Sequence, residues 1–480
     1  MKRVVVIGAG MGGLTASLRL ARAGFDVLVV EARRDSGGLA SGFQMDGFVF
    51  DAGPYILLDR PGLEWAFDAV GLNLAERVSL RRIEDVYEVS GPGATLRFYA
   101  SAEQTAAGFD GVWPGSGRRY LKFVAEMARI YANLQPLLTR SQPGIRDLLR
   151  LGAWKQTRFL TRSLGSVLRA AALPEPVQQA IAIWTHIAGQ PASEAPSPMA
   201  FVPALIHNFG CFSVSGGIGS IPQALTSAAV DAGVRFRFAT PVRTIQTRDG
   251  RVHAVETGEG ERIEAAAVVS NCNAIGTYLD LLDSTPRDVR GRLLRLPLQS
   301  PGVCAYLALK GTPRAPYLRF LLPENARCRL LIAPGVLNPE LARDGWFPAR
   351  LLGPMDYAEA ERLGARGQQQ YVERLVEEGW WRENAGAFRV LATRTPTQWG
   401  SEFHLFRNSM NPVMTARFMR QGRFAHRSPH IRGLYLAGSS THPGQWVSFC
   451  AISGVLAANC AIEDLPASTN GTPESGQPKC

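Results

Sequence analysis

Several common functional signatures are missing from this 480-residue sequence. The seven cysteines are scattered and include no Cys-x-x-Cys pair, so we expect neither a disulfide framework nor a metal site. Neither Gly-x-Ser-x-Gly nor Gly-x-x-x-x-Gly-Lys occurs, which removes the main support for a serine hydrolase or a P-loop enzyme.

Long apolar runs and an N-terminal leader are also lacking. No run of about 20 apolar residues occurs, so we predict no segment that spans a membrane. Regular structure is predicted directly after Met1-Lys2-Arg3, which leaves no room for a signal peptide and favours a cytoplasmic location.

Acidic residues are outnumbered, with 41 Asp and Glu against 52 Lys and Arg, and the net charge is +11. A basic surface can simply aid solubility, or it can bind nucleic acid or anionic lipid. No helix-turn-helix, zinc finger or aromatic-basic sheet motif is present. We therefore expect no nucleic acid partner and favour a lipid surface.

The chain begins with the pattern of a dinucleotide-binding βαβ unit. Val4–Ile7 is predicted as a buried strand, Leu14–Ala23 as a helix, and Phe25–Val30 as a second strand that ends at Glu31. A carboxylate at this position can accept hydrogen bonds from both hydroxyls of a ribose. The unit alone does not distinguish NAD from FAD.

The glycines between the first strand and the helix have separate roles in such a unit. Gly8 allows a tight turn, Gly10 lets the backbone approach a pyrophosphate, and Gly13 lets the helix pack closely on the strand. The N-terminus of the helix then directs its free N–H groups at the phosphates.

Residues 118–190 are predicted to be mostly helical, with one long helix over 146–172. On that helix four basic side chains fall within an arc of roughly 60°, and four apolar ones face the other way: Lys155, Arg158, Arg162 and Arg169, against Leu160, Leu164, Val167 and Leu168. Such a helix either lies in a membrane interface or packs on a core with a solvated basic face.

Later segments return to short strands. The pattern predicts a helix from the Gly216 region to Ala232, a three-stranded meander and a return to the main sheet, and then a final strand and helix. The predicted ranges are strands 234–238, 242–247, 252–256, 263–270 and 434–437, and a helix over 448–462.

Four segments together resemble the flavin-dependent carotenoid oxidoreductases, the phytoene desaturase and carotene isomerase group of the FAD amine-oxidase superfamily. They are Gly37-Gly38 with 46–54 (Asp-Gly-Phe-Val-Phe-Asp-Ala-Gly-Pro), 215–225, 268–271 with 278–282, and 433–444 (Gly-Leu-Tyr-Leu-Ala-Gly-Ser-Ser-Thr-His-Pro-Gly).

This resemblance implies an α/β fold with a Rossmann-like FAD-binding domain built from discontinuous segments, a mixed α+β substrate domain and a helical insertion. We assign 1–75, 216–275 and 428–465 to the FAD-binding domain and 76–110 with 276–427 to the substrate domain. Residues 111–215 form the helical insertion, a candidate for membrane association, and 466–480 form a disordered tail.

The resemblance and the βαβ unit together predict a site for non-covalently bound FAD. Val242 matches the valine whose backbone faces the adenine, and Gly438 with the helix after Trp446 matches the segment that holds the ribityl chain and the flavin pyrimidine. The predicted cofactor-binding residues are Gly8, Gly10, Met11, Gly12, Gly13, Glu31, Ala32, Gly38, Leu39, Gly53, Pro54, Val242, Gly438, Trp446, Val447 and Ser448.

The sequence departs from the family at Leu39, before Gly216, where the usual proline is missing, and over 445–450. Leu39 stands where the family has an arginine, so a phosphate contact is lost or comes from elsewhere, such as Arg33 or Arg34. After Gly444 the family continues with small residues, whereas 445–450 is bulky here. A substrate whose shape differs from that of phytoene is expected.

Three side-chain roles stay open at this stage. His442 is either a proton relay or electrostatic partner, or a turn residue beside Pro443. Asp46-Gly47 between short apolar runs predicts a hairpin, and Asp51 is either an anchor of that hairpin or a base. Trp446 and Phe449 are either an apolar wall beside the flavin or ordinary core residues.

The main hypothesis is an FAD-dependent desaturase or isomerase that acts on a carotenoid or related apolar isoprenoid by hydride transfer to flavin. One alternative is an amine-oxidase-type flavoenzyme for a small polar substrate. Another is a non-catalytic prenyl-binding protein, against which Glu31 and the intact glycine turn argue.

Overall fold

The computed structural model of the chain describes residues 1–186, 189–324, 327–379 and 387–465; the predicted tail 466–480 lies outside them. A five-stranded parallel sheet is assembled from distant stretches of chain in the order β19-β13-β1-β2-β9. The strands are β1 (Arg3–Ile7), β2 (Asp26–Val30), β9 (Arg235–Arg237), β13 (Ala267–Ser270) and β19 (Leu434–Leu436). The predicted Rossmann-like sheet of discontinuous segments is confirmed.

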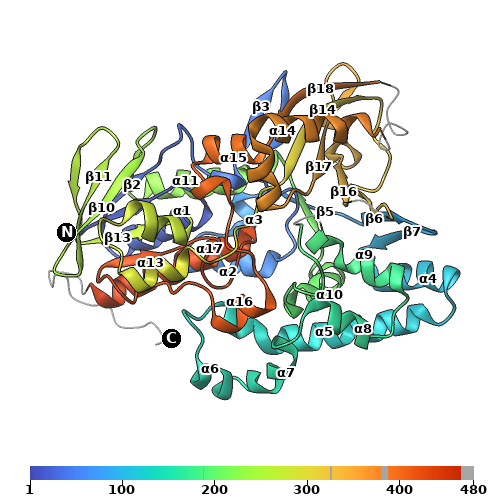
Figure 1. Cartoon of the computed structure of the whole chain (residues 1–480), viewed down its shortest axis with the longest axis horizontal. Helices are drawn as coiled ribbons and strands as arrows, with labels where there is room; N and C mark the ends of the chain where they lie inside the picture. The colour runs from blue at the N-terminus through green and yellow to red at the C-terminus, as the bar shows by residue number, and fades with distance from the viewer. Residues whose placement is uncertain (187–188, 325–326, 380–386, 466–480) are drawn as a thin grey trace.

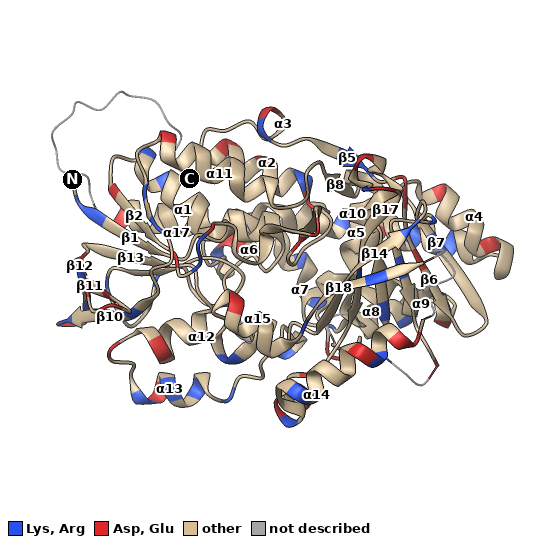
Figure 2. Ribbon diagram, turned by 90° about the horizontal axis from the view of Figure 1, so that it is seen from above, with Lys and Arg blue, Asp and Glu red and all other residues tan. Residues whose placement is uncertain are grey.

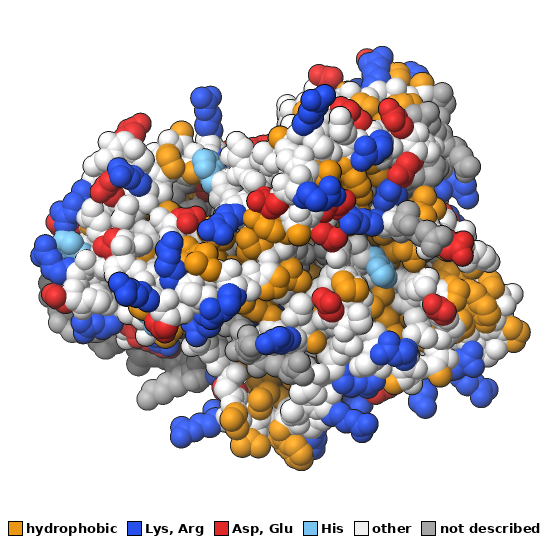
Figure 3. Space-filling model, viewed as in Figure 1, with side chains coloured by type: hydrophobic (Ala, Val, Ile, Leu, Met, Phe, Trp, Pro, Cys, Tyr) orange, Lys and Arg blue, Asp and Glu red, His pale blue; other side chains and the backbone are white. Residues whose placement is uncertain are grey.

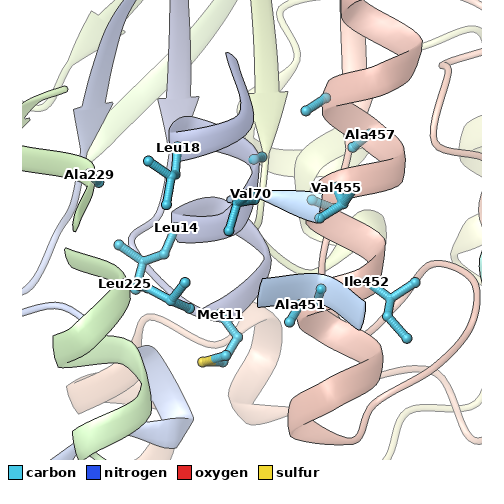
Figure 4. Packing of buried hydrophobic residues seen from close by; sticks show 14 of the residues in the cluster. Met11, Leu14, Leu18, Val70, Leu225, Ala229, Ala451, Ile452, Val455 and Ala457 are labelled. Atoms are coloured by element: carbon cyan, nitrogen blue, oxygen red, sulfur yellow. The ribbon is translucent and has the colours of Figure 1, made fainter. Parts of the chain in front are cut away.

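The alternation of side chains along each strand explains why both faces of this sheet are covered. Val4 and Val6 face one apolar cluster, and Val5 and Ile7 face another. The first cluster lies under helices α1 (Met11–Arg22), α2 (Arg60–Ala69), α11 (Ser220–Asp231) and α17 (Val447–Asp464). Figure 4 shows Leu14 and Leu18 of α1 between Leu225 of α11 and Val455 of α17.

A three-stranded antiparallel sheet covers the other face of the parallel sheet. It consists of β10 (Val242–Arg248), β11 (Arg251–Thr257) and β12 (Arg262–Glu264). Ile245, Val252 and Ile263 bury against Val5 and Val268.

A second, seven-stranded mixed sheet is ordered β18-β14-β17-β16-β15-β6-β7. Its strands are β6 (Asp85–Gly91), β7 (Ala94–Tyr99), β14 (Val303–Lys310), β15 (Leu318–Leu321), β16 (Arg329–Ile332), β17 (Trp346–Gly353) and β18 (Phe388–Arg394). α14 (Tyr357–Glu377) covers one face. The hairpin β3 (Gly42–Met45)–β4 (Phe48–Asp51) and α15 (Pro396–Phe403) pack on the other. Figures 1 and 2 place the two sheets at opposite ends of the long axis, with α15 between them.

A helical layer joins the seven-stranded sheet through a core rich in aromatic residues, among them Tyr87, Phe98 and Tyr120. Its helices are α4 (Ala102–Val112), α5 (Ser116–Leu138), α6 (Ile145–Arg150), α7 (Thr157–Leu160), α8 (Leu164–Ala170), α9 (Glu175–His186) and α10 (Val202–Phe209). The remaining short α-helices and strands are α3 (Leu74–Arg77), α12 (Ala274–Gly276), α13 (Arg287–Leu293), α16 (Ala416–Gln421), β5 (Leu80–Arg82) and β8 (Phe212–Val214).

The prediction of one amphipathic helix over 146–172 is wrong. The segment forms α6, a 3-10 turn over Ala153–Gln156, α7 and α8. Gly152 adopts a left-handed φ of 68°, and the Ser163 side chain caps the start of α8. The predicted basic arc therefore does not exist as a face of one helix.

Smaller corrections concern element ends. The strand predicted over 263–270 is two strands, because the chain leaves β12 in one sheet and enters β13 in the other. The helix predicted from the Gly216 region starts at Ser220, since Gly216 and Gly217 have positive φ. The first helix starts at Met11, three residues earlier than predicted.

One described helix, α17, is long and apolar enough to cross a membrane by length and composition. About two thirds of it is buried inside the protein, and it packs against α1 and α2. This degree of burial is typical of a helix in a protein core.

Candidate functional site

The glycines after β1 form a cradle that accepts no side chain. A Cβ on Gly13 would lie 2.0 Å from the Gly8 carbonyl oxygen, and one on Gly12 would lie 2.8 Å from the Gly438 nitrogen. The α1 helix begins there with no side-chain cap and no acidic residue in its first turn. Its first N–H groups, from Met11 onward, are therefore available to an anion such as a diphosphate.

Glu31 lies buried at the end of β2, where the predicted ribose contact requires it. Its carboxylate accepts hydrogen bonds from the Ala9 amide at 2.6 Å and the Arg33 amide at 2.8 Å. The backbone around Ala32 is tied to the approach to β10, because Thr240 N donates to Glu31 O and Ala239 N donates to Arg33 O. This pairing brings Val242, the predicted adenine neighbour, to the same end of the site.

The second glycine loop closes over the first. Gly37 N donates to Ala9 O at 2.8 Å, and a Cβ on Gly38 would be 3.4 Å from the Gly10 Cα. A Cβ on Gly53 would be 2.6 Å from the Leu39 carbonyl oxygen. Gly38, Leu39, Gly53 and the adjoining Pro54 are thus brought to the N-terminal cradle.

Arg33 does not simply take over the role of the arginine that the family has at position 39. Leu39 packs against the apolar cluster that contains Phe48 and Phe50. Arg33 donates to Gly38 O and Ser41 Oγ and pairs with Asp35. Arg33 therefore supports the loop itself.

The C-terminal segment completes the site. Gly438 N donates to Ser453 Oγ at 2.9 Å, which ties the end of β19 to α17. Trp446 precedes α17, whose N-terminus has no side-chain cap and no acidic residue in its first turn. The Ser448 Oγ is buried and lies beside the buried carboxyl group of Asp59. Val447 and Ser448 thus begin a helix with free amides, which suits an electron-rich ring edge.

Sequence reasoning missed Asn271 as a site residue. Its side chain lies among the glycines, since a Cβ on Gly10 would be 2.6 Å from its Nδ2 and one on Gly438 would be 2.6 Å from its Oδ1. Asn271 follows β13, the neighbour of β1, at the carboxyl end of the sheet. That position in a predicted parallel strand was the available signal.

Asp51 anchors the hairpin to the loop before α11, which favours the anchor interpretation over a base. Its Oδ1 accepts from the Ile218 amide at 2.7 Å. Arg350, almost completely buried on β17, donates to Gly53 O at 3.0 Å and Ala52 O at 3.3 Å. Burial raises the pKa of Asp51 to about 6, and the Arg350 charge and the Ile218 amide oppose that rise.

Replacing Asp51 with asparagine is expected to flatten the pH dependence of stability. Between about pH 4 and pH 6 the folded chain keeps a proton on Asp51 that the unfolded chain has lost. The free energy of unfolding therefore falls as pH rises there, by up to about 1.4 kcal/mol per pH unit from this group. Urea unfolding of both proteins from pH 4.5 to 8 measures the difference, and parallel curves would contradict the assignment.

His442 is held by contacts within the protein. Its Nε2 donates to the Leu137 carbonyl at 2.8 Å, and its own carbonyl accepts from His426 Nε2 at 2.9 Å. Burial lowers the pKa of His442 to about 4, so the ring is neutral at pH 7. These contacts favour the turn-residue interpretation, and a catalytic role for His442 stays a prediction.

Trp446 and Phe449 stack with ring centroids 4.9 Å apart. Trp446 packs on the cluster shared by the helical layer and the seven-stranded sheet, and Phe449 packs on the cluster under α17. The pair lies where these two cores meet.

Comparison with known protein families agrees with the cofactor site that this geometry indicates. Residues 11–275, more than half of the chain, match the family described as flavin containing amine oxidoreductase. The chain belongs to this family. The glycine cradle, Glu31 and the uncapped helix ends fit a flavin nucleotide, and this flavin-containing oxidoreductase is accordingly an enzyme with a flavin cofactor.

Relatives of this oxidoreductase extend over nearly its whole length. It is 30% identical to a zeta-carotene-forming phytoene desaturase of Myxococcus xanthus, covering 95% of this chain and 93% of that protein. It is 25% identical to a 4,4'-diapolycopene oxygenase of a Methylomonas species, covering 97% and 99%. It resembles the solved structure of putrescine oxidase with a TM-score of 0.66 at 17% identity, covering 96% and 99%. The last likeness bears on the fold alone.

Proposed function

We propose that the protein is an FAD-dependent oxidoreductase that desaturates or isomerises a carotenoid or a related apolar isoprenoid. The observation that carries the proposal is the site assembled from the Gly8–Gly13 turn, Glu31 and the start of α17 in a chain whose full-length relatives act on carotenoids. A glycine turn for a diphosphate and a carboxylate for a second ribose support FAD over a mononucleotide flavin.

A bound flavin would supply the two-electron acceptor for a hydride from an allylic carbon, while the neighbouring proton leaves to water or a base. The protein's own part is positioning. Gly53 and Pro54 approach the glycine cradle from the hairpin. The N-terminus of α17 presents its free backbone amides to the same site. Trp446 and Phe449 would provide an apolar surface for a substrate that has no group to ionise.

The deciding experiment is co-expression with a phytoene-producing pathway, followed by chromatography of the pigments. The expected result is a product with altered conjugation or double-bond geometry, and a purified protein that is yellow or becomes so with FAD. The Gly10→Val variant is the matched control, because a Cβ there meets Asn271. This variant should neither form the altered pigment nor bind FAD. Unchanged phytoene together with a protein that takes up no FAD would overturn the proposal.

The same material separates the two alternatives. Oxidation of small amines by the purified protein, without any effect on isoprenoids, would identify an amine oxidase. Prenyl binding that survives in Gly10→Val would identify a binding protein.

We also propose that the enzyme is cytoplasmic and attaches peripherally to a membrane through the tip formed by α6 and the following turn. Three apolar side chains stand out there, with Ile145 76%, Leu149 60% and Trp154 52% exposed. Exposed cations surround them, namely Arg146, Arg150, Lys155 and Arg158. Figure 3 shows a hydrophobic patch rimmed by basic side chains at the lower edge, where Figure 1 places α6 and α7. This composition suits an anionic bilayer surface.

Replacing Ile145, Leu149 and Trp154 together with serine is expected to weaken binding to anionic liposomes at least about tenfold, since each side chain adds about 1.5–3 kcal/mol when buried. Flotation of the purified protein measures this. Val230 is 56% exposed on α11, away from the tip, and Val230→Ser is the control. Equal flotation of the triple variant and wild type would contradict the proposal.

A further inference from the structure

Arg423 is a buried cation without a countercharge in the described part of the chain. Its Nε is buried and has no hydrogen-bond partner, and its Nη1 makes a single long contact of 3.5 Å to the Ser439 carbonyl. Burial lowers its pKa to about 10, so the guanidinium still carries its charge at neutral pH.

Several other buried or part-buried arginines of the described chain are paired with carboxylates. Arg329 binds Glu378, Arg394 binds Glu402, and Arg427, four residues after Arg423, binds Glu463 and Asp464. A buried charge that lacks a partner is strongly destabilising. An arginine retained in this state is expected to meet an anion that the polypeptide itself does not provide.

The position of Arg423 indicates which anion this is. Its Nη2 is 3.2 Å from where a Cβ of Gly444 would lie, and Cys450 of α17 is beside it. Ser439 directly follows Gly438, whose nitrogen abuts Gly12 in the glycine cradle. Arg423 therefore flanks the segment that leads from the diphosphate cradle to the N-terminus of α17.

We propose that Arg423 supplies positive charge to the flavin ring and stabilises the negative charge that the ring gains on reduction. This inference rests on the proposed function. Oriented amides of α17 and one guanidinium would act together from the same segment, and a fixed charge in a dry site acts more strongly than it would in water. Arg423 would thereby favour transfer of electrons to the cofactor.

The test uses the FAD-loaded protein and sulfite, which adds reversibly to oxidised flavins and leaves negative charge on the ring. Arg423→Gln is expected to raise the sulfite dissociation constant at least about tenfold, because the substitution removes one charge-assisted hydrogen bond. The flavin midpoint potential should fall by at least about 30 mV, which is tenfold for a two-electron couple. Arg423→Lys keeps the charge and should restore most of the affinity and potential.

Arg427→Gln is the matched control, because Arg427 is close in sequence but already paired with Glu463 and Asp464; its sulfite affinity should equal that of wild type. Arg423→Met keeps the apolar stem and serves as a second neutral variant if Arg423→Gln does not fold. FAD-loaded neutral variants with wild-type sulfite affinity and potential would overturn the inference. Failure of the wild-type protein to bind FAD would instead overturn the proposed function.

Discussion

Replacing Gly454 with valine is expected to separate α1 from α17 and to abolish flavin binding. A Cβ at Gly454 would lie 2.0 Å from the Gly12 carbonyl oxygen and 2.1 Å from the Thr15 Oγ1. Thr15 Oγ1 also donates to Ala451 O at 2.9 Å, so the two helices are fixed at this point. Relief of the overlap must displace the glycine cradle, and we expect the free energy of unfolding to fall by about 3 kcal/mol or more. Thermal unfolding and protein-bound flavin absorbance measure the two effects.

Gly108→Ala provides the matched control for this prediction. Gly108 lies in the helix α4, its φ is not positive, and a Cβ there meets nothing within 4 Å. Alanine should therefore leave flavin binding intact and stabilise the helix by up to about 1 kcal/mol. Gly454→Val protein with wild-type stability and flavin content would show that α1 and α17 do not pack as described.

Replacing Arg350 with methionine is expected to be the most damaging change outside the glycine cradle. The Arg350 guanidinium supplies hydrogen bonds to the carbonyls of Ala52 and Gly53, and its charge acts on Asp51. Without it a buried carboxylate loses its compensating charge, which costs about 3–5 kcal/mol. We expect the loss to be largest above about pH 6, where Asp51 is ionised. Urea unfolding at pH 5 and pH 8 measures both the loss and its pH dependence.

The control for Arg350 is another arginine that contacts the same hairpin. Arg343 is exposed and donates to Gly47 O at 3.3 Å, so Arg343→Met should change stability by no more than about 0.5 kcal/mol. Equal effects of the two substitutions would mean that burial and the Asp51 charge have no special role.

Local patterns in the sequence were sufficient for much of the fold. The glycine turn, the strand ending at Glu31 and the Asp46-Gly47 hairpin are each specified within about 30 residues by turn chemistry and strand alternation. The structure has β1, β2 and the β3–β4 hairpin where these signals lie. The Rossmann-like sheet was expected from the resemblance to the flavin-dependent family, and buried apolar runs such as 434–437 were predicted as strands.

The errors have equally physical causes. The 146–172 segment has helical periodicity, but Gly152 and the capping Ser163 interrupt it. Asn271 and Arg350 were missed because their partners are remote in sequence. Asn271 meets glycines about 260 residues earlier, and the carbonyls that Arg350 binds lie 297 and 298 residues earlier. Periodicity carries no information on such pairs.

The dependence of Gly12 on Gly438 has a consequence for biosynthesis. While the ribosome is still translating the codons before β19, the nascent chain already contains its complete phosphate turn, but Gly438 and Gly454 do not yet exist. Cofactor capture must therefore wait until the ribosome has synthesised β19 and α17. Products of premature termination would lack the flavin altogether, which would leave them without redox activity and with an apolar helix α1 for the quality-control machinery to recognise.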